Sequence, residues 1–194
     1  YGWVTDGIFQ NADEINAYVN ADGNLYQPNA IPGDVRFKDL DKDGDIDDDD
    51  RGYIGKGTPD WMYGLNINLT YKGFDLGLLF QGVAGVQVFN VTRRTDLAYV
   101  NLPKWMLNRW TGEGTSNTVP RFTVLEDPNQ NWRSSDLWVE DGDYFRLKNA
   151  QLGYTLPSAL TKKALISSVR VYVAAENLFT LTKYRGFDPE ISSA

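Results

Sequence analysis

Apolar and polar residues alternate in two long neighbouring segments of the chain. From Trp61 to Tyr71 every second residue is apolar, and the same alternation returns over residues 74–81, with Lys72-Gly73 between the two runs. A period of two is typical of a β-strand with one apolar face, and a tight turn between two such runs indicates a β-hairpin. Each strand is roughly ten residues long, which exceeds the usual ~5–6 of soluble sheets and matches the ~9–11 residues of a tilted membrane-spanning strand.

Two further strands are expected nearer the C-terminus. Residues 143–155 alternate, but the alternation slips near Asn149–Leu152, which indicates a β-bulge. Residues 169–176 alternate cleanly, after a short connection over 158–167. The tail from residue 177 to 194 is predicted to be a loop.

The other segments carry turn signals instead of a regular pattern. Residues 1–34 are expected to be irregular, apart from a short helix over Ala12–Val19. Residues 101–142 are predicted to form a long loop with a helical turn over Lys104–Trp110. Such a long connection is unusual in a compact soluble domain and ordinary for the outward loop of an outer-membrane barrel. The sequence thus divides into a loop region, 1–60, and a single partial domain of strands and loops, 61–194.

Composition narrows the possible chemistry. The 194 residues include 19 Lys+Arg and 26 Asp+Glu, a net charge of −7, and an acidic chain disfavours nucleic acid as a partner. The absence of Cys and His excludes disulfides, zinc sites with those ligands and the Ser-His-Asp triad. Carboxylate-only glycosidase chemistry would need a pair among Glu140, Asp141 and Asp143, which we interpret as a turn that leads into a strand. We therefore predict no enzyme activity.

The ends and the hydropathy give two more expectations. No run approaches the ~20 continuous apolar residues of a membrane helix. The chain starts at Tyr1 without a basic and then apolar leader, so we expect either a processed domain or a piece of a longer protein. A membrane barrel stays compatible with both observations, because its strands alternate.

The most specific local motif is an acidic loop over residues 39–50. It matches the calcium-loop pattern D-x-[DN]-x-[DN]-G with an acid at the twelfth position. Alternate carboxylates can converge on one Ca²⁺, Gly44 permits the sharp turn, and Asp45 would offer its backbone carbonyl. The predicted metal ligands are Asp39, Asp41, Asp43, Asp45, Asp47 and Asp50.

Two features qualify this calcium prediction. The last ligand position usually carries Glu, and here it carries the shorter Asp50. The flanking segments do not look like paired helices, so we interpret the motif as a calcium-stabilised loop and not as a calcium-sensing switch. The alternative is a solvated acidic run without a metal ion.

In order along the chain, several motifs are similar to those of one family. The chain resembles the C-terminal part of SusC/RagA-family TonB-dependent outer-membrane transporters of Bacteroidetes-type bacteria. The stretches that carry this resemblance are Pro32–Asp39 with Asp50-Arg51, Gly55–Asp60, Tyr63–Asn66, Tyr71–Leu76, Phe80–Val83, Arg109–Thr111, Glu140–Asn149, Leu152–Pro157, Arg170–Val173, Glu176–Thr180, Thr182–Tyr184 and Asp188–Glu190.

The resemblance implies a fold and a role. Family members are barrels of about 22 strands with an N-terminal plug, and they import oligosaccharides or peptides with energy relayed by TonB. A SusD-like surface lipoprotein covers the barrel. The chain would then be all-β: a few late antiparallel strands of a large outer-membrane β-barrel, with long outward loops. It would contact outer-membrane lipid and a glycan or peptide substrate, while the TonB complex would contact an N-terminal part absent from it.

Two groups of aromatic residues leave alternatives open. Six aromatic residues near the strand ends fit an interfacial girdle or ordinary sheet packing: Trp61, Tyr63, Tyr71, Phe74, Tyr154 and Tyr172. Four in the long loop could stack on sugars or touch a lid protein, although we favour the interpretation that they fix the loop in place: Trp105, Trp110, Trp132 and Trp138. The alternative for the whole chain is a soluble secreted calcium-binding β-module that binds glycan or a protein partner.

Overall fold

A computed structural model describes residues 1–90, 101–123 and 126–190. The described chain forms two compact units, one from residues 1–55 and 89–139 and the other from residues 56–88 and 140–194. Within the described residues, no helix is long and apolar enough to cross a bilayer. The elements, in chain order, are β1 (Gly2–Trp3), β2 (Thr5–Ile8), α1 (Ala12–Ala17), β3 (Val35–Phe37), the 3-10 helix η1 (Asp48–Asp50), β4 (Arg51–Gly52), β5 (Trp61–Tyr71), β6 (Phe74–Ala84), β7 (Gln87–Phe89), the 3-10 helix η3 (Lys104–Asn108), the 3-10 helix η4 (Asp136–Trp138), β8 (Val139–Asp141), β9 (Tyr144–Thr155), α2 (Ser158–Thr161), the 3-10 helix η5 (Lys162–Ala164) and β10 (Arg170–Thr182).

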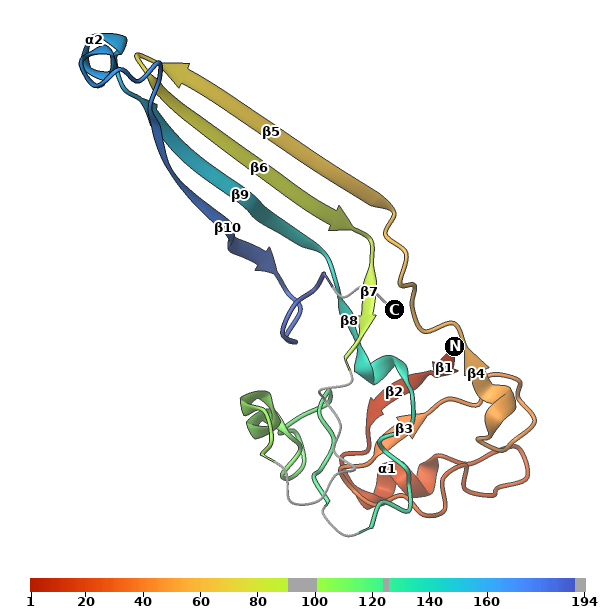
Figure 1. Cartoon of the computed structure of the whole chain (residues 1–194). Coiled ribbons are helices and arrows are strands. Elements are labelled where there is room, and N and C mark those ends of the chain that lie inside the picture. The colour runs from red at the N-terminus through yellow and green to blue at the C-terminus, as the bar shows by residue number, and fades with distance from the viewer. Residues whose placement is uncertain (91–100, 124–125, 191–194) are drawn as a thin grey trace. The chain divides into compact units, whose positions relative to one another are not determined.

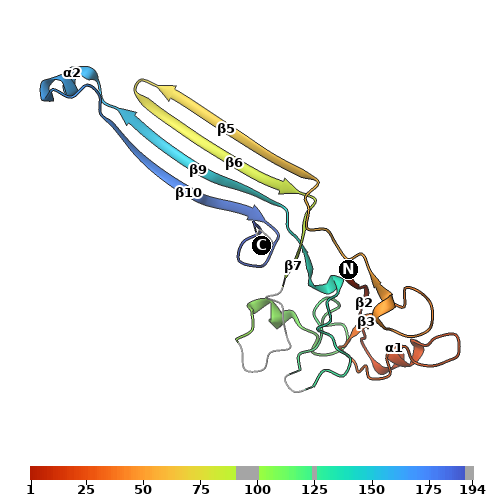
Figure 2. The ribbon, with the colours of Figure 1, turned by 45° about the vertical axis from the view of Figure 1, so that its right-hand side comes forward.

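The second unit is built on a four-stranded antiparallel sheet in the order β10-β9-β6-β5. The four strands run side by side in both views (Figure 1 and Figure 2). The predicted hairpin between β5 and β6 is confirmed, with Tyr71 opposite Phe74. Its two-residue turn places Lys72 at φ 47° and Gly73 at φ 87°, and such a pair of positive φ values is typical of a type I′ turn.

The predicted bulge is also present, one residue earlier than expected. On β9, Asn149 lies opposite Leu79 of β6, while Leu147 lies opposite the next residue of β6, Phe80. Lys148 is therefore the extra residue, and it shifts the alternation of β9 by one position.

The expectation of a loop from residue 177 is wrong, because β10 continues to Thr182. Two residues, Asn177 and Leu178, oppose the single Lys148 of β9 between the paired positions. Asn177 takes φ 50°, and beyond it the strand resumes with Phe179. Residues 191–194 of the expected loop lie outside the described residues.

Register divides the sheet into an apolar and a polar face. Each row below runs across neighbouring strands on the apolar face: Tyr71, Phe74, Tyr154, Val171; Leu69, Leu76, Leu152, Val173; Ile67, Leu78, Ala150, Ala175; Leu65, Phe80, Leu147, Phe179; Tyr63, Gly82, Phe145, Leu181. Aromatic side chains lie at both ends of this face and aliphatic ones between them. Tyr172 lies near the start of β10, as expected, but it pairs with Gly153 and belongs to the polar face, so of the two interpretations ordinary sheet packing fits it better than a girdle on the apolar face.

The first unit has its own small core. Phe9, Ile15 and Ala30 pack together, with Tyr18 against them. Helix α1 starts at an Asn11 cap, whose side-chain oxygen accepts the Glu14 N–H, and ends at Ala17, two residues before the expected Val19.

The expectation of irregular structure over residues 1–34 is wrong for the first eight residues. β1 pairs with β4, and β2 pairs with β3, in two short antiparallel ladders. In the long loop, the helical turn expected from residue 104 is confirmed as η3.

Candidate metal centre and its surroundings

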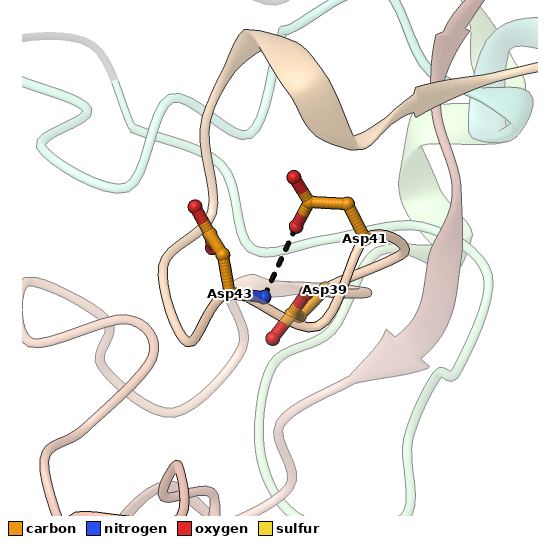
Figure 3. A group of neighbouring side chains, drawn as sticks. All are labelled: Asp39, Asp41 and Asp43. Carbon is orange, nitrogen blue, oxygen red and sulfur yellow. Dashed lines mark hydrogen bonds between the residues drawn. The ribbon is translucent and has the colours of Figure 1, made fainter.

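Three acidic side chains of the loop that follows β3 lie close together. Asp39, Asp41 and Asp43 each offer one carboxylate oxygen, and these oxygens lie within 4.8 Å of one another (Figure 3). Calcium–oxygen distances are about 2.3–2.6 Å, so two ligands of one ion can be up to about 5 Å apart. The three carboxylates are therefore close enough to share one cation.

Backbone hydrogen bonds shape this loop. The Asp39 carboxylate accepts the Lys42 N–H at 2.6 Å and the Gly44 N–H at 3.1 Å. The Asp41 carboxylate accepts the Asp43 N–H at 3.2 Å, the bond drawn in Figure 3. Gly44 takes φ 102°, a backbone conformation that favours glycine. Because a carboxylate has about four acceptor sites, these bonds leave oxygen lone pairs for a metal ion.

The structure gives the other predicted ligands different surroundings. Asp50 is only 1% exposed, and its carboxylate accepts the Leu40 N–H at 2.5 Å and the Asp47 N–H at 2.9 Å. Asp47 caps η1 by accepting the Asp49 N–H at 2.8 Å. Asp45 is exposed. For Asp45, Asp47 and Asp50, metal ligation stays a prediction.

Like charges affect protonation in the loop. The hydrogen bond from the Asp43 N–H lowers the pKa of Asp41, but desolvation and the negative charges of Asp43, Asp50 and Asp39 outweigh it and raise that pKa. The pKa of Tyr26 is also raised, first by desolvation and then by the Asp39 charge. A bound cation would reduce the repulsion between the carboxylates that contributes to these raised pKa values.

Two neighbouring segments hold the loop in place. The Trp3 indole N–H donates to the Asp47 carbonyl at 2.8 Å. The Asn20 side-chain amide donates to the Gly44 carbonyl at 3.0 Å. These two hydrogen bonds hold the acidic loop at Gly44, in its sharp turn, and at Asp47, in its last third.

A buried polar network, which the sequence did not indicate, joins distant segments of the same unit. The fully buried Asp34 carboxylate accepts from Arg121 Nε at 2.5 Å and from Asn131 Nδ2 at 2.8 Å. Asn131 Oδ1 in turn accepts the Val35 N–H at 2.7 Å. The residues that this network joins are about a hundred positions apart in sequence, so no local sequence pattern indicates the network.

The long-loop tryptophans take different positions. Trp138 is 4% exposed and donates its indole N–H to the Arg133 carbonyl at 2.9 Å. Trp110 donates to the Gln10 side chain at 3.2 Å. These two fix the loop, as favoured from the sequence, whereas Trp132 is half exposed.

A second network lies at one end of the sheet. The buried Arg146 of β9 forms ion pairs with Asp188 at 2.5 Å and Glu190 at 2.6 Å, and Lys148 also pairs with Glu190. The hydrogen bond from Arg146, helped by the Arg146 charge, lowers the pKa of Asp188. The sequence predicts Asp188 and Glu190 as loop residues, and no local pattern in it indicates their arginine partner.

Glu140 and Asp143, two of the acids that a glycosidase mechanism would need, accept hydrogen bonds from backbone N–H groups. Glu140 accepts the Arg185 N–H at 3.0 Å, and Asp143 accepts the Val86 N–H at 3.1 Å. Both bonds hold turns in place, which agrees with the interpretation of this stretch as a turn leading into a strand.

The polar face of the sheet carries a shallow cavity of about 450 Å³. Amide side chains from β5 and β9 line it, among them Asn68 and Gln151. Asp75 of β6 also lines it and is paired with Arg170 of β10. This face can exchange hydrogen bonds with polar groups, whereas the opposite face cannot.

Comparisons with known proteins give a consistent set of relatives. No family model matches the chain. It is 38% identical over 193 residues to TonB-dependent receptor P3 of Formosa agariphila, which covers 98% of this chain and 18% of that receptor. It is 27% identical over 173 residues to TonB-dependent receptor SusC of Bacteroides thetaiotaomicron, which covers 87% of this chain and 16% of that receptor.

Solved structures of a peptide importer are also similar to the chain. The RagAB peptide importer in its 'open-open' state matches with a TM-score of 0.66 and 25% identity, over 97% of this chain and 19% of that chain. The same importer in its 'closed-closed' state matches with a TM-score of 0.62 and 26% identity, over 97% of this chain and 20% of that one. The chain therefore spans about a fifth or less of the proteins that it matches.

Proposed function

We infer that the chain is a SusC/RagA-like segment of a TonB-dependent receptor, and we propose that it serves in a nutrient importer of the outer membrane. Receptors of this type are outer-membrane proteins and transporters, so the location and the antiparallel barrel strands predicted from the sequence are confirmed. A role without catalysis is consistent with these relatives.

The two-faced sheet is the observation that carries this proposal. Leu65, Leu69 and Val173 of the apolar face are 54%, 59% and 71% exposed within the described chain. Tyr63 and Tyr71, near the two ends of this face, are eight residues apart on β5. At about 3.3 Å per residue and a tilt of about 40°, they are roughly 20 Å apart along the membrane normal, close to the ~25 Å apolar band of such barrels. Lipid would cover the apolar face, and the polar face would line the interior.

The proposed importer would need parts beyond this chain. We propose a SusD-like surface lipoprotein as its lid, a TonB complex as its energy source, and an oligosaccharide or a peptide as its cargo. The SusC and RagAB relatives support the lipoprotein and the TonB complex in general terms. The amide-lined polar face is suited to either cargo, because both present many hydrogen-bonding groups.

A growth experiment tests the transport proposal. A host strain that lacks the receptor should fail to grow on one class of oligosaccharide or peptide, and the restored gene should recover growth. The lipoprotein should copurify with the receptor from detergent-solubilised outer membranes. Recovery of the protein in the soluble fraction, or unchanged growth on every such nutrient, would refute the proposal.

We further propose Ca²⁺ as the ion of the acidic loop. The three converging carboxylates of Asp39, Asp41 and Asp43 support this proposal. Ca²⁺ prefers oxygen ligands, and calcium-binding loops supply them from alternate positions with this spacing. Asp41→Asn with Asp43→Asn should abolish the calorimetric heat of calcium binding. The matched control changes two exposed acids outside the group, Asp48→Asn with Asp49→Asn, and should retain most of that heat. Equal heats in both double variants would contradict the assignment.

The alternative of a soluble β-module can be tested directly. Such a module would leave the apolar face in water, where contiguous apolar patches of that size favour aggregation. A protein that stays monomeric after removal of detergent would support the module and contradict the barrel segment.

A further inference from the structure

A small cavity of about 190 Å³ lies within the first unit, beside the acidic loop. Its walls come from four segments: residues 26–29, Phe37 of β3, Ile46 of the acidic loop, and the three residues Pro128, Asn129 and Arg133. With about 30 Å³ per water molecule, the volume corresponds to roughly six waters. It is below the ~300–1,000 Å³ of pockets for drug-sized ligands and suits one monosaccharide or one amino-acid unit.

Arg133 contributes the positive charge of this cavity. Its guanidinium carbon lies 5.2 Å from the Trp3 ring centre and 5.3 Å from the Phe37 ring centre. Its Nε donates to the Gln130 side chain at 3.0 Å. Among the described residues, the structure records no hydrogen bond or ion pair from its two terminal NH2 groups. Burial lowers the pKa of Arg133, and the charges of Asp48 and Asp127 act in the opposite direction, but an arginine stays protonated at neutral pH.

The two buried amides of the wall, Gln27 and Asn129, already use their hydrogen-bonding groups. Gln27 donates to the Val35 carbonyl at 2.9 Å and to Asn129 Oδ1 at 2.7 Å, and its own oxygen accepts the Phe37 N–H at 2.8 Å. Asn129 Nδ2 donates to the Val35 carbonyl at 2.9 Å. Both residues are buried and line the cavity, and their hydrogen bonds hold them in place, so they do not offer free donors to a ligand. Among the described residues that line the cavity, Arg133 thus supplies charged donors that no recorded hydrogen bond uses.

We propose that this cavity binds a carboxylate carried by a unit the size of one sugar or one amino acid, with Arg133 as its anchor. A guanidinium presents two parallel N–H groups that match the two oxygens of a carboxylate, and a bidentate pair of this kind is short and directional. The Trp3 and Phe37 rings keep the guanidinium in one orientation, which lowers the entropy lost on binding. The acidic residues nearby disfavour ligands with several negative charges, so a single carboxylate fits best. This inference does not depend on transport or on the bound ion.

Binding measurements on the longest natural protein that carries these residues, purified in detergent, test the proposal. Glucuronate and N-acetylglycine present the same carboxylate on a sugar and on an amino acid, and glucose and N-acetylglycinamide are their neutral counterparts. At least one acid should bind about 10- to 100-fold more tightly than its neutral counterpart, which is the usual effect of a charge-assisted hydrogen bond. Whichever acid binds identifies the source of the carboxylate. Equal binding of acid and neutral forms, or binding of neither acid, would overturn the proposal.

Two variants assign the effect to Arg133. Arg133→Gln should weaken binding of the acid about 10- to 100-fold and leave binding of the neutral counterpart unchanged. The control is Arg51→Gln, because Arg51 also stacks on the Trp3 ring, at 4.7 Å, but does not line the cavity. Unchanged acid binding in Arg133→Gln, or an equal loss in Arg51→Gln, would refute the assignment. If Arg133→Gln fails to fold, the comparison of acid with neutral ligand on the unaltered protein still decides the proposal.

Discussion

Replacement of Asp34 by alanine should loosen the connection between residues 31–37 and the long loop. Asp34 is fully buried, and its carboxylate accepts from Arg121, Asn131 and the Ile31 N–H. The change leaves a guanidinium, an amide and a backbone N–H without their acceptor. Removal of one partner of a buried ion pair costs about 3–5 kcal/mol. The Arg121 side chain is 19% exposed, so water compensates part of the loss and we expect about 3 kcal/mol.

Hydrogen exchange measures this change locally, without requiring reversible unfolding of a whole membrane protein. A loss of about 3 kcal/mol in the free energy of local opening speeds exchange by about 150-fold. The informative amides are those of Val35 and Arg121. The Val35 N–H donates to the Asn131 side chain, and the Arg121 N–H donates to the Gly33 carbonyl.

The control variant is Asp6→Ala. Asp6 pairs with Arg36 in the same unit but its side chain is 51% exposed, so we expect less than about 1 kcal/mol and less than about fivefold faster exchange. If Asp34→Ala speeds exchange no more than Asp6→Ala does, the buried network does not hold these segments together.

Three further predictions concern the sheet, the acidic loop and the partly buried Tyr18. Ile67→Arg, in the middle row of the apolar face, should cost about 2–4 kcal/mol and reduce the heat-modifiable folded band on gels, whereas Asn68→Arg on the polar face should be tolerated. Gly44→Ala should weaken calcium binding in calorimetry, because a residue with a side chain rarely adopts φ 102°; an unchanged affinity would contradict this. Burial raises the pKa of Tyr18 to about 12, above the ~10 of an unfolded chain, so stability that is complete below pH 10 should be lost between pH 10 and 12. Tyr18→Phe should remove this decline in chemical unfolding measurements, since it removes the hydroxyl that donates to Phe37.

The strands were predictable because the two faces of the sheet meet different surroundings. Along β5, apolar Leu65 and Ile67 alternate with Asn66 and Asn68, and that alternation is visible without any partner strand. The end of β10 was not predictable in the same way. Asn177 and Leu178 add a bulge, which changes the phase of the pattern, so Phe179 no longer continues the alternation that precedes it.

The candidate metal centre was predictable for a similar reason. Asp39, Asp41 and Asp43 are brought together by one local turn, and their spacing in sequence already contains that geometry. Arg133 and the Asp34 network depend instead on contacts between segments separated by about a hundred residues. Such contacts follow from the packing of the whole unit, and a single sequence carries no local sign of them.

The interleaving of the two units has a consequence for the order of folding. Strands β6 and β9 are neighbours in the sheet, yet roughly sixty residues separate Ala84 from Tyr144. If the first unit folds early, its bond from the Asn90 N–H to the Trp138 carbonyl already brings the two ends of that connection together. The loop left to close then shrinks to about a dozen residues, and the entropic cost of pairing falls by about 1.5 kcal/mol. We therefore expect the loops to act as an internal template that speeds assembly of the sheet.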